Sequence, residues 1–267
     1  MRSALTRRAH VLCTCVLWGV LNNSMTNLSV NLNKVALLRN ARPLTIPSVV
    51  KMGEICIQAG AHGLTVHPRP DERHIRRTDV YDLAELLKKH PTIEYNIEGN
   101  PLEAPFMDII RDVKPDQCTL VPDDPTQNTS DHGWNVTQDG EKLKPIIDEL
   151  NRLGCRVSLF MDPDIEQIKH VPQLDCSRIE LYTEPYATAY REGKGSESFE
   201  IYKQAAEYAQ SVGLGVNGGH DLSLENLPKF KEIPNLLEVS IGHALTADAL
   251  EMGFAGAVKA YLDVLAA

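Results

Sequence analysis

The stretch LSVNLN, residues 28–33, is a short apolar run that ends in polar residues able to bind phosphate. Seven similar runs follow it, and nearly every one ends in a residue that can bind phosphate or move a proton: GLTVH (63–67), IEYNIE (93–98), QCTLVP (117–122), RVSLFMD (156–162), RIELYT (178–183), LGVNGGH (214–220) and LEVSIGH (237–243). In a (β/α)8 barrel, the carboxyl ends of the strands converge on one active-site mouth. The runs therefore predict eight strands with a site at their carboxyl ends.

Helical patterns separate these runs at regular intervals. Apolar residues recur at helical spacing over residues 47–59, 78–90, 103–113, 138–153, 164–170, 196–212, 224–232 and 246–265. Strict alternation of strand and helix indicates a parallel sheet, and the lack of a GxGxxG turn favours a closed barrel over an open nucleotide-binding sheet. We expect one α/β domain over residues 25–267, a (β/α)8 TIM barrel, because such barrels run to about 250 residues.

The composition points to small-molecule partners. The formal net charge is -9 at pH 7, and the basic residues are scattered along the chain, so the sequence lacks the basic patch of a nucleic-acid-binding protein. The six cysteines include no CxxC pair, which indicates buried free thiols in a reducing compartment. We therefore expect a cytoplasmic protein with no nucleic-acid partner.

Residues 1–24 do not share the barrel pattern. Arg2, Arg7 and Arg8 precede an apolar stretch over residues 11–21, which is too short to span a bilayer but long enough for the core of a signal peptide. A secretory signal, another targeting extension, and upstream sequence joined to a start at Met25 are the three alternatives. We favour the last, because Met25 leads directly into the first strand, and we expect residues 1–24 to lie outside the fold, with no membrane partner.

The second predicted strand leads into a strongly basic loop, TVHPRPDERHIRR at residues 65–77. His67 ends the strand, and Arg69 and His74 follow within a segment that two prolines stiffen. Arginine offers a planar fork of donors to phosphate oxygens, so this loop is a candidate anion site. The alternative is a solvated loop whose positive charges are offset by Asp71 and Glu72.

Two carboxylates on predicted strands are candidates for proton transfer. Glu98 closes the third strand, where burial would raise its pKa towards the neutral range that suits a general base. Glu180 lies within the sixth strand between apolar neighbours, so strand alternation places it either inside the barrel or among the helices. A structural hydrogen bond and a catalytic role are both open for Glu180.

The last two strands end in glycine and histidine, as NGGH (217–220) and IGHA (241–244). Glycines let backbone amides approach a phosphate closely, and the loops after strands seven and eight are the usual phosphate site of this fold. His220 is a candidate acid, and His243 is a candidate to donate its backbone amide. Either histidine could instead be a structural residue.

Taken together, these motifs resemble the pyridoxine 5'-phosphate synthase family. The resemblance extends from about residue 27 to the C-terminus and rests on VNLNKVALLRNAR (30–42), GLTVHPRPDERHI (63–75), NIE (96–98), LVP (120–122) with Thr129, VSLFMD (157–162), IELYT (179–183), VNGGH (216–220) and IGHA (241–244). It implies a TIM barrel with additional helices and assembly as a homo-octamer. We expect no cofactor and no metal, because proton transfer accounts for the acidic and imidazole groups and the sequence shows no closed ligand set. The implied enzyme is a transferase of vitamin B6 biosynthesis that condenses 1-deoxy-D-xylulose 5-phosphate with 3-amino-2-oxopropyl phosphate, with release of inorganic phosphate and water.

The resemblance also implies roles for individual residues. His67 and Glu98 would be proton acceptors, His220 a proton donor, and Glu180 a group that stabilises charge. The amino-ketone phosphate would be bound by Asn31, Arg42, Gly242 and His243, and the pentose phosphate by Arg69, His74 and Thr129. Repeated proton transfers around a Schiff base suit a single mouth that holds several acid/base groups.

Three departures from the family pattern, which involve four residues, are present. Asn33-Lys34 stands where many members have Asp-His, and Pro43 stands where a glycine is expected. Asp221 replaces a usual glycine, and we include it among the predicted substrate-binding residues. The alternatives are a metal-dependent TIM-barrel hydrolase, whose zinc ligands would come from the same histidines and glutamates, and a non-catalytic phosphate-binding barrel. The first strand lacks the HxH pair that would favour the hydrolase.

Overall fold

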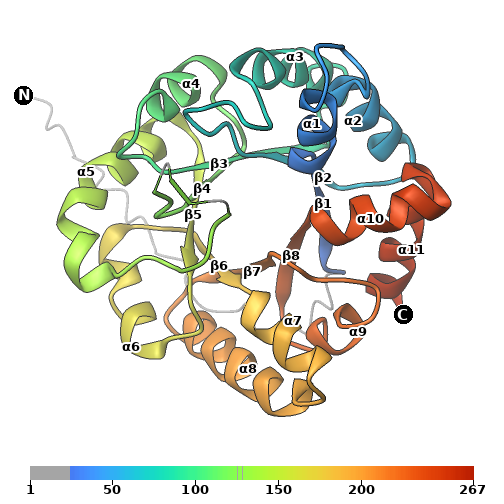
Figure 1. Cartoon of the computed structure of the whole chain (residues 1–267). Coiled ribbons are helices and arrows are strands. Elements are labelled where there is room, and N and C mark those ends of the chain that lie inside the picture. Colours follow the sequence, from blue (N-terminus) through green and yellow to red (C-terminus); the bar gives the residue numbers. More distant parts are fainter. Residues whose placement is uncertain (1–24, 125, 128) are drawn as a thin grey trace, which may run out of the picture.

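The computed structural model describes residues 25–267 except 125 and 128, and in it eight parallel strands form a closed barrel. The strands are β1 (Asn27–Asn31), β2 (Gly63–Val66), β3 (Glu94–Gly99), β4 (Gln117–Leu120), β5 (Arg156–Met161), β6 (Arg178–Tyr182), β7 (Gly215–Gly219) and β8 (Leu236–Ile241). Pairing of β1 with β8, in the register Ser29 to Ser240, closes the ring (Figure 1). The predicted (β/α)8 fold is confirmed.

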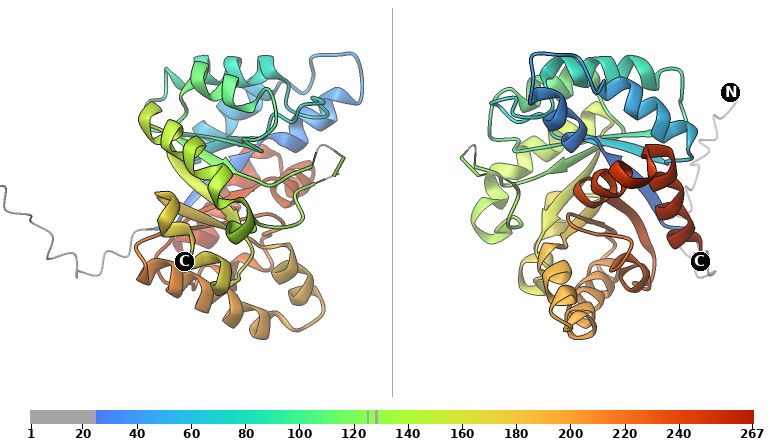
Figure 2. Two further views of the ribbon diagram at one scale, coloured as in Figure 1. Left: turned by 90° about the vertical axis from the view of Figure 1, so that its left-hand side faces the viewer. Right: turned by 45° about the vertical axis from the view of Figure 1, so that its right-hand side comes forward.

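The helices surround this barrel, as the side views also show (Figure 2). They are α1 (Asn33–Asn40), α2 (Val49–Gln58), α3 (Arg77–Leu87), α4 (Phe106–Val113), α5 (Val136–Leu153), α6 (Ile165–Ile168), α7 (Glu184–Arg191), α8 (Gly195–Ser211), α9 (Leu227–Phe230), α10 (His243–Met252) and α11 (Phe254–Ala266), with a short 3-10 helix, η1 (Val171–Leu174). In Figure 1, α1, α7 and α10 lie beside the barrel opening, inside the ring formed by α2, α8 and α11. These three helices are additional to the outer helices of the (β/α)8 barrel.

Strand alternation divides the strand residues into two sets. Leu28, Val30 and Leu64 are fully buried and belong to the apolar core between strands and helices. The alternate residues are polar and contact one another inside the barrel, and they include Ser29, Thr65, Asn96, Gln117, Thr119, Asn217 and Glu238. Gln117 on β4 donates to Glu238 on β8 at 3.3 Å, a contact that crosses the barrel. The barrel interior is therefore a hydrogen-bonded polar network.

Three helix predictions were wrong. We predicted strand up to Asn33 and no helix at α1, where Val35 and Ala36 are buried but Leu37 and Leu38 are exposed. We predicted none at α7 either, although Pro185 near its start suits the first turn of a helix. The continuous helix predicted over residues 246–265 is two helices, because Gly253 has a φ of +74° that interrupts the helical backbone.

The remaining expectations concern thiols and membranes. Cys56, Cys118, Cys155 and Cys176 are free and buried, as the sequence indicated. Among the described helices, none combines the length and apolar character that crossing a bilayer requires. The predictions for residues 1–24 lie outside the described part of the chain.

Candidate active site

A cavity of about 340 Å³ opens at the carboxyl ends of the strands, which we call the mouth. This volume is within the range of small-molecule sites. Every predicted site residue except Arg42 lines it: Asn31, His67, Arg69, His74, Glu98, Thr129, Glu180, His220, Asp221, Gly242 and His243. Predicted residues from seven of the eight strands or the loops after them thus meet in one cavity, as the strand-end pattern predicted.

Arg42 does not line the cavity. It is exposed on the segment between α1 and α2, next to Leu44 and Ile46, which expose 50% and 69% of their surface. Its guanidinium is therefore not part of the mouth in the single chain. The sequence placed Arg42 in the site through the family resemblance alone.

Glu98, the first of two glutamates that line the cavity, lies near the end of β3 on the interior side. Its Oε2 accepts a hydrogen bond from Asn31 Nδ2 at 3.3 Å and lies 3.8 Å from His67 Nδ1. Burial, with the nearby charges of Asp123 and Glu238, raises the pKa of Glu98 to about 8. A carboxyl group with this pKa can exchange a proton near neutral pH.

Glu180 lies deeper in the barrel, so the interior alternative is correct. Thr119 Oγ1 donates to its Oε2 at 3.4 Å. Burial and the neighbouring Glu98 raise the pKa of Glu180 well above its usual value. Gly219 on β7 makes room for this side chain, because a Cβ there would meet Glu180 Oε1 at 2.0 Å. The sequence therefore keeps a glycine in β7 where a buried carboxyl group fills the space.

His67 and Arg69 follow β2 directly and are almost completely buried. Asp123, after β4, contacts both: its Oδ2 is 2.6 Å from Arg69 Nη2 and 3.5 Å from His67 Nε2. Burial and the positive charge of Arg69 lower the pKa of His67 well below 6.5. His67 is therefore a neutral imidazole, which can accept a proton.

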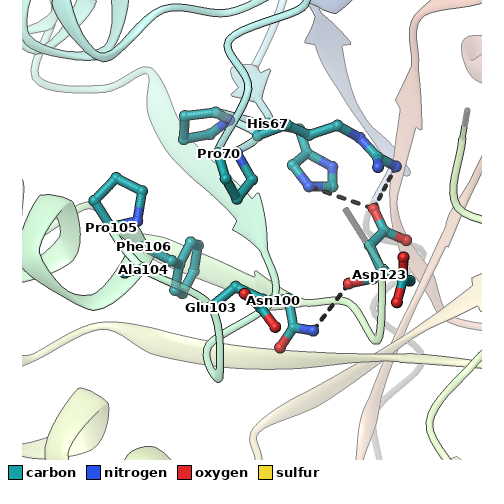
Figure 3. Close-up of a pocket in the computed structure, with 11 residues that line it drawn as sticks. His67, Pro70, Asn100, Glu103, Ala104, Pro105, Phe106 and Asp123 are labelled. Carbon is teal, nitrogen blue, oxygen red and sulfur yellow. Dashed lines mark hydrogen bonds and ion pairs between the residues drawn. The ribbon is translucent and has the colours of Figure 1, made fainter. Parts of the chain in front are cut away.

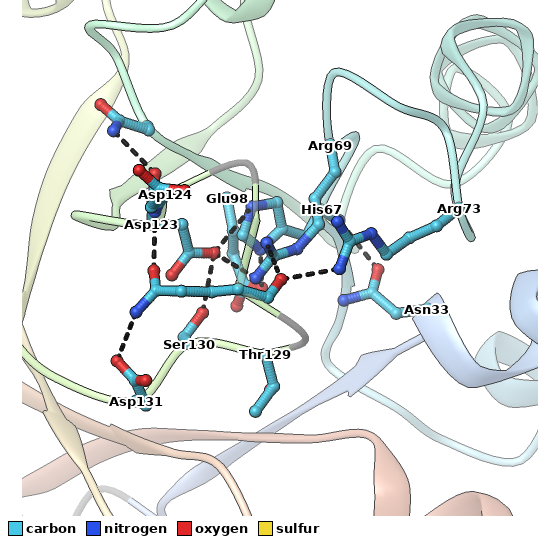
Figure 4. Close-up of polar contacts among 12 residues, drawn as sticks. Asn33, His67, Arg69, Arg73, Glu98, Asp123, Asp124, Thr129, Ser130 and Asp131 are labelled. Carbon is cyan, nitrogen blue, oxygen red and sulfur yellow. Dashed lines mark hydrogen bonds and ion pairs between the residues drawn. The ribbon is translucent and has the colours of Figure 1, made fainter.

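Asp123 is a site residue that sequence reasoning missed. Ser130 Oγ also donates to its Oδ2, at 3.0 Å. Figure 4 shows this carboxylate among Arg69, His67 and Ser130. The sequence could have identified it, because Asp123 directly follows the LVP run of the fourth strand. A polar residue directly after a predicted strand was the criterion that selected the other candidates.

The basic loop after β2 is held in place by contacts to two other segments. Arg69 Nη1 and Arg73 Nη1 both donate to the backbone oxygen of Gln127, at 3.0 and 2.6 Å. On the other side, Asn40 Nδ2 at the end of α1 donates to the backbone oxygen of His74 at 2.8 Å. The alternative of a loosely solvated loop is therefore wrong for Arg69, which is buried with fixed partners.

Two positive side chains line the cavity beside His74. Arg69 and Lys34 lie close enough that, together with burial, they lower the pKa of His74 to about 4. Its Nδ1 accepts a hydrogen bond from the backbone N–H of Ile75 at 2.9 Å. This side of the mouth is thus positively charged through Arg69 and Lys34, as an anion site requires.

The end of β7 carries His220 and Asp221, both with positive φ. His220 Nε2 is 2.8 Å from Thr129 Oγ1 on the opposite loop, and its Nδ1 is 3.4 Å from Asp221 Oδ2. The contact with His220 lowers the pKa of Asp221. Thr129 and His220, far apart in the sequence, therefore meet across the mouth.

The last side of the cavity is formed by β1 and the start of α10. Gly242 lies against Asn31, because a Cβ at Gly242 would meet Asn31 Cβ at 3.1 Å. His243 is the first residue of α10, a ten-residue helix whose N-terminal amides suit a phosphate. The departure at Asn33 has a structural use, since its Oδ1 accepts the backbone N–H of His67 at 2.9 Å.

The assembled groups suit acid/base chemistry on an anionic substrate. Two carboxyl groups with raised pKa values, a neutral imidazole and a second histidine face one cavity, and arginine, lysine and helix amides surround them. Within the described residues, no three His, Cys, Asp or Glu side chains are grouped so that they could hold a metal ion. The arrangement favours proton transfer at a site that holds phosphate.

Comparison with known proteins gives a consistent result. The family model described as "Pyridoxal phosphate biosynthesis protein PdxJ" matches residues 28–267. Proteins named pyridoxine 5'-phosphate synthase from Albidiferax ferrireducens and Bacteroides fragilis are 50% and 51% identical to the chain, over 90% of its length in each case. The matches cover 98% and 100% of those relatives.

Solved structures with low identity share the fold. A tryptophan synthase from M. tuberculosis matches with a TM-score of 0.60 at 12% identity, covering 91% of this chain and 92% of its own. A thiamine phosphate pyrophosphorylase from Pyrococcus furiosus matches with a TM-score of 0.56 at 10% identity, covering 91% and 96%. These similarities concern the barrel alone.

Proposed function

We propose that this chain, which belongs to the PdxJ family of pyridoxal phosphate biosynthesis proteins, catalyses the ring closure that forms pyridoxine 5'-phosphate. The substrates are 1-deoxy-D-xylulose 5-phosphate and 3-amino-2-oxopropyl phosphate, and the other products are inorganic phosphate and water. The observation that carries this proposal is the meeting of Glu98, Glu180, His67 and His220 in one cavity with a positively charged side. Formation of the ring needs several proton transfers, which these groups can supply.

The proton-transfer roles follow from the environments of the side chains. His67 and Glu98 act as proton acceptors, which suits a neutral imidazole and a carboxyl group whose pKa is about 8. His220 acts as the proton donor, held by Thr129 and Asp221. Glu180 stabilises charge that develops next to Glu98, because the two carboxyl groups interact inside the barrel.

The two substrate phosphates bind on different sides of the mouth. The pentose phosphate contacts Arg69, His74 and Thr129, on the side where Lys34 adds positive charge. The amino-ketone phosphate contacts the start of α10 at Gly242 and His243, together with Asn31. Asp221 lies near the second group and is suited to the substrate amine, because its pKa is lowered and it stays ionised.

The assembly is a homo-oligomer, and the family resemblance makes an octamer the expected form. Exposed apolar side chains support this, since Leu37, Leu38, Leu44 and Ile46 gather on α1 and the segment that follows it. Arg42 lies within this surface, so its assignment to the amino-ketone phosphate requires a contact that the single chain does not make. Sedimentation analysis of the purified protein measures the number of copies.

The catalytic unit is a single domain over residues 25–267, and the protein is cytoplasmic. The family match over residues 28–267 and the closed barrel support the first part. The buried free thiols support a reducing compartment. A chain that starts at Met25 should be active, and fractionation of the source cells should place the full chain in the cytoplasm.

The experiment that tests the function is an assay of the purified full chain with both phosphorylated substrates. Pyridoxine 5'-phosphate and inorganic phosphate should appear together in equal amounts, and neither should form when one substrate is omitted. Activity that is lost to a chelator and restored by a metal would favour the metal-dependent hydrolase. Binding of both substrates without product would favour the non-catalytic barrel.

A further inference from the structure

Asp123 contacts His67 but does not itself line the mouth. The imidazole has a carboxylate on each side: Glu98 Oε2 is 3.8 Å from Nδ1, and Asp123 Oδ2 is 3.5 Å from Nε2. Glu98 lines the large cavity, whereas Asp123 lines a separate cavity of about 20 Å³, large enough for one water molecule. Figure 3 shows Asp123 with dashed contacts to His67 and to the neighbouring guanidinium.

The two ring nitrogens therefore face different surroundings. Nδ1 lies beside Glu98, which lines the mouth, and Nε2 lies beside Asp123, which lines the small cavity. A neutral histidine carries one proton, and the hydrogen bond made by one nitrogen decides which nitrogen is the base. The residue behind His67 thus determines which nitrogen can accept a proton from a substrate.

We propose that Asp123 is a positioning residue that holds His67 in the tautomer protonated on Nε2, so that Nδ1 is the basic atom facing the substrate. The proposal deepens the proposed function and rests on it for the role of His67 as a proton acceptor. The 3.5 Å separation is slightly longer than a good hydrogen bond, and such contacts shorten when substrate binds.

The remaining contacts of Asp123 suit this role. Arg69 Nη2 at 2.6 Å and Ser130 Oγ at 3.0 Å both donate to Oδ2, which fixes the carboxylate and opposes the effect of burial on its pKa. Backbone contacts of Arg69 and Arg73 with Gln127 hold the same loop in place. Asp123 therefore connects the proposed base to the guanidinium that binds the pentose phosphate.

The direct test is the protonation of His67 in the wild-type full chain. Solid-state 15N NMR of histidine-labelled protein distinguishes the two tautomers, and a His67→Gln variant identifies the His67 signals. We expect a protonated Nε2 and an unprotonated Nδ1 at pH 7. A proton on Nδ1 would overturn the proposal, whatever any variant does.

A matched pair of variants tests the consequence for catalysis. Asp123→Ala removes the acceptor beside Nε2, so His67 should lose its preference for the tautomer protonated on Nε2 and kcat should fall by about 100-fold or more. Asp124→Ala removes the adjacent carboxylate, which is exposed and accepts hydrogen bonds from Thr126 in its own loop, and should leave both the tautomer and kcat nearly unchanged. Retention of tautomer and kcat in Asp123→Ala would contradict the proposal.

A second, milder variant guards against simple unfolding of the first. Ser130→Ala removes a neutral donor from Asp123 while leaving its contacts with His67 and Arg69, so the tautomer should persist and kcat should fall only a few-fold. A change of tautomer in Ser130→Ala would contradict the assignment to Asp123. If the wild-type chain forms no pyridoxine 5'-phosphate, the proposed function fails, but the NMR measurement still decides the role of Asp123.

Discussion

Buried carboxyl groups occupy both ends of the barrel interior, but their partners differ. At the mouth, Glu98 and Glu180 contact Asn31, Thr119 and the neutral His67. At the opposite end, Arg178 lies 3.6 Å from Glu238, and Arg156 pairs with Glu94. Among the described residues, neither mouth carboxyl group has an arginine or lysine within ion-pair distance.

The two ends of the barrel show how a buried carboxyl group with a structural role differs from one that can transfer a proton. The pKa of Glu238 is raised to about 8 by burial and Glu94, even though Arg178 opposes the shift. Glu98 has a similar pKa, so a raised pKa alone does not identify a proton-transfer group. What distinguishes Glu98 and Glu180 is that they line the mouth cavity, where a substrate can reach them.

The largest expected difference between the two ends concerns turnover. Glu98→Gln preserves the shape of the side chain but removes the proposed proton acceptor, so kcat should fall by about 10²–10⁴-fold while both substrates still bind. Glu238→Gln makes the same change at the opposite end and should alter kcat little. Steady-state kinetics of the two variants compares them, and equal losses would remove the distinction between the ends.

Removing a cation from the opposite end should affect stability. Arg178→Met removes the guanidinium that lies beside Glu238 and donates to Asn217 Oδ1, and loss of this donor inside the barrel should lower the free energy of unfolding by about 2–3 kcal/mol. Denaturant titration at a fixed protein concentration measures this change. If stability is unchanged, the pair at this end does not have the structural role assigned to it.

The equivalent change at the mouth should act on substrate affinity. Arg69→Ala removes the charge-assisted hydrogen bonds that we propose Arg69 makes to the pentose phosphate, and such bonds are worth about 1.5–3 kcal/mol. The KM for 1-deoxy-D-xylulose 5-phosphate should therefore rise by roughly 10–100-fold, and the KM for the amino-ketone should change less. Initial rates with each substrate varied in turn test this, and an unchanged pentose phosphate KM would refute the anion site.

The smallest expected effect is a gain in stability. The pKa of Glu180 is higher in the folded chain than in the unfolded chain. Below about pH 4.5 the group is protonated in both states, so it does not change the free energy of unfolding. At higher pH Glu180 ionises more readily in the unfolded chain, and the free energy of unfolding falls. Glu180→Gln should raise the free energy of unfolding by about 1 kcal/mol at pH 7 and lose this advantage towards pH 4.5. Thermal unfolding at both pH values measures it; a loss of stability at pH 7 would show that Glu180 is structurally required.

The sequence predicted the barrel and most of the cavity because both depend on local patterns. Because polar residues at the ends of buried strands form the mouth, the sequence predicted that Glu98 and His220 lie there, and both line the cavity. The same rule did not select Asp123, because its importance depends on contacts with a distant loop that holds Arg69. The charged pair of Arg178 and Glu238 was missed for a similar reason, since the two strands meet only in three dimensions.

The helix predictions failed where the apolar spacing of the sequence does not show that a helix is present or where it ends. The exposed leucines of α1 leave no single apolar face, so its sequence gives no helical stripe. The division at Gly253 depends on a backbone angle that apolar spacing does not reveal. Arg42 could be connected to the site only through resemblance, because it lies outside the cavity of the single chain.

If Glu98 accepts a proton at the mouth, as we propose, the pH dependence of kcat/KM should follow the ionisation of its carboxyl group. Because its pKa is about 8, Glu98 is mostly protonated at pH 7 and becomes an active base as the pH rises. The wild-type profile should increase with pH and level off above about pH 8, and this limb should be absent in Glu98→Gln. The same limb in both proteins would contradict the claim.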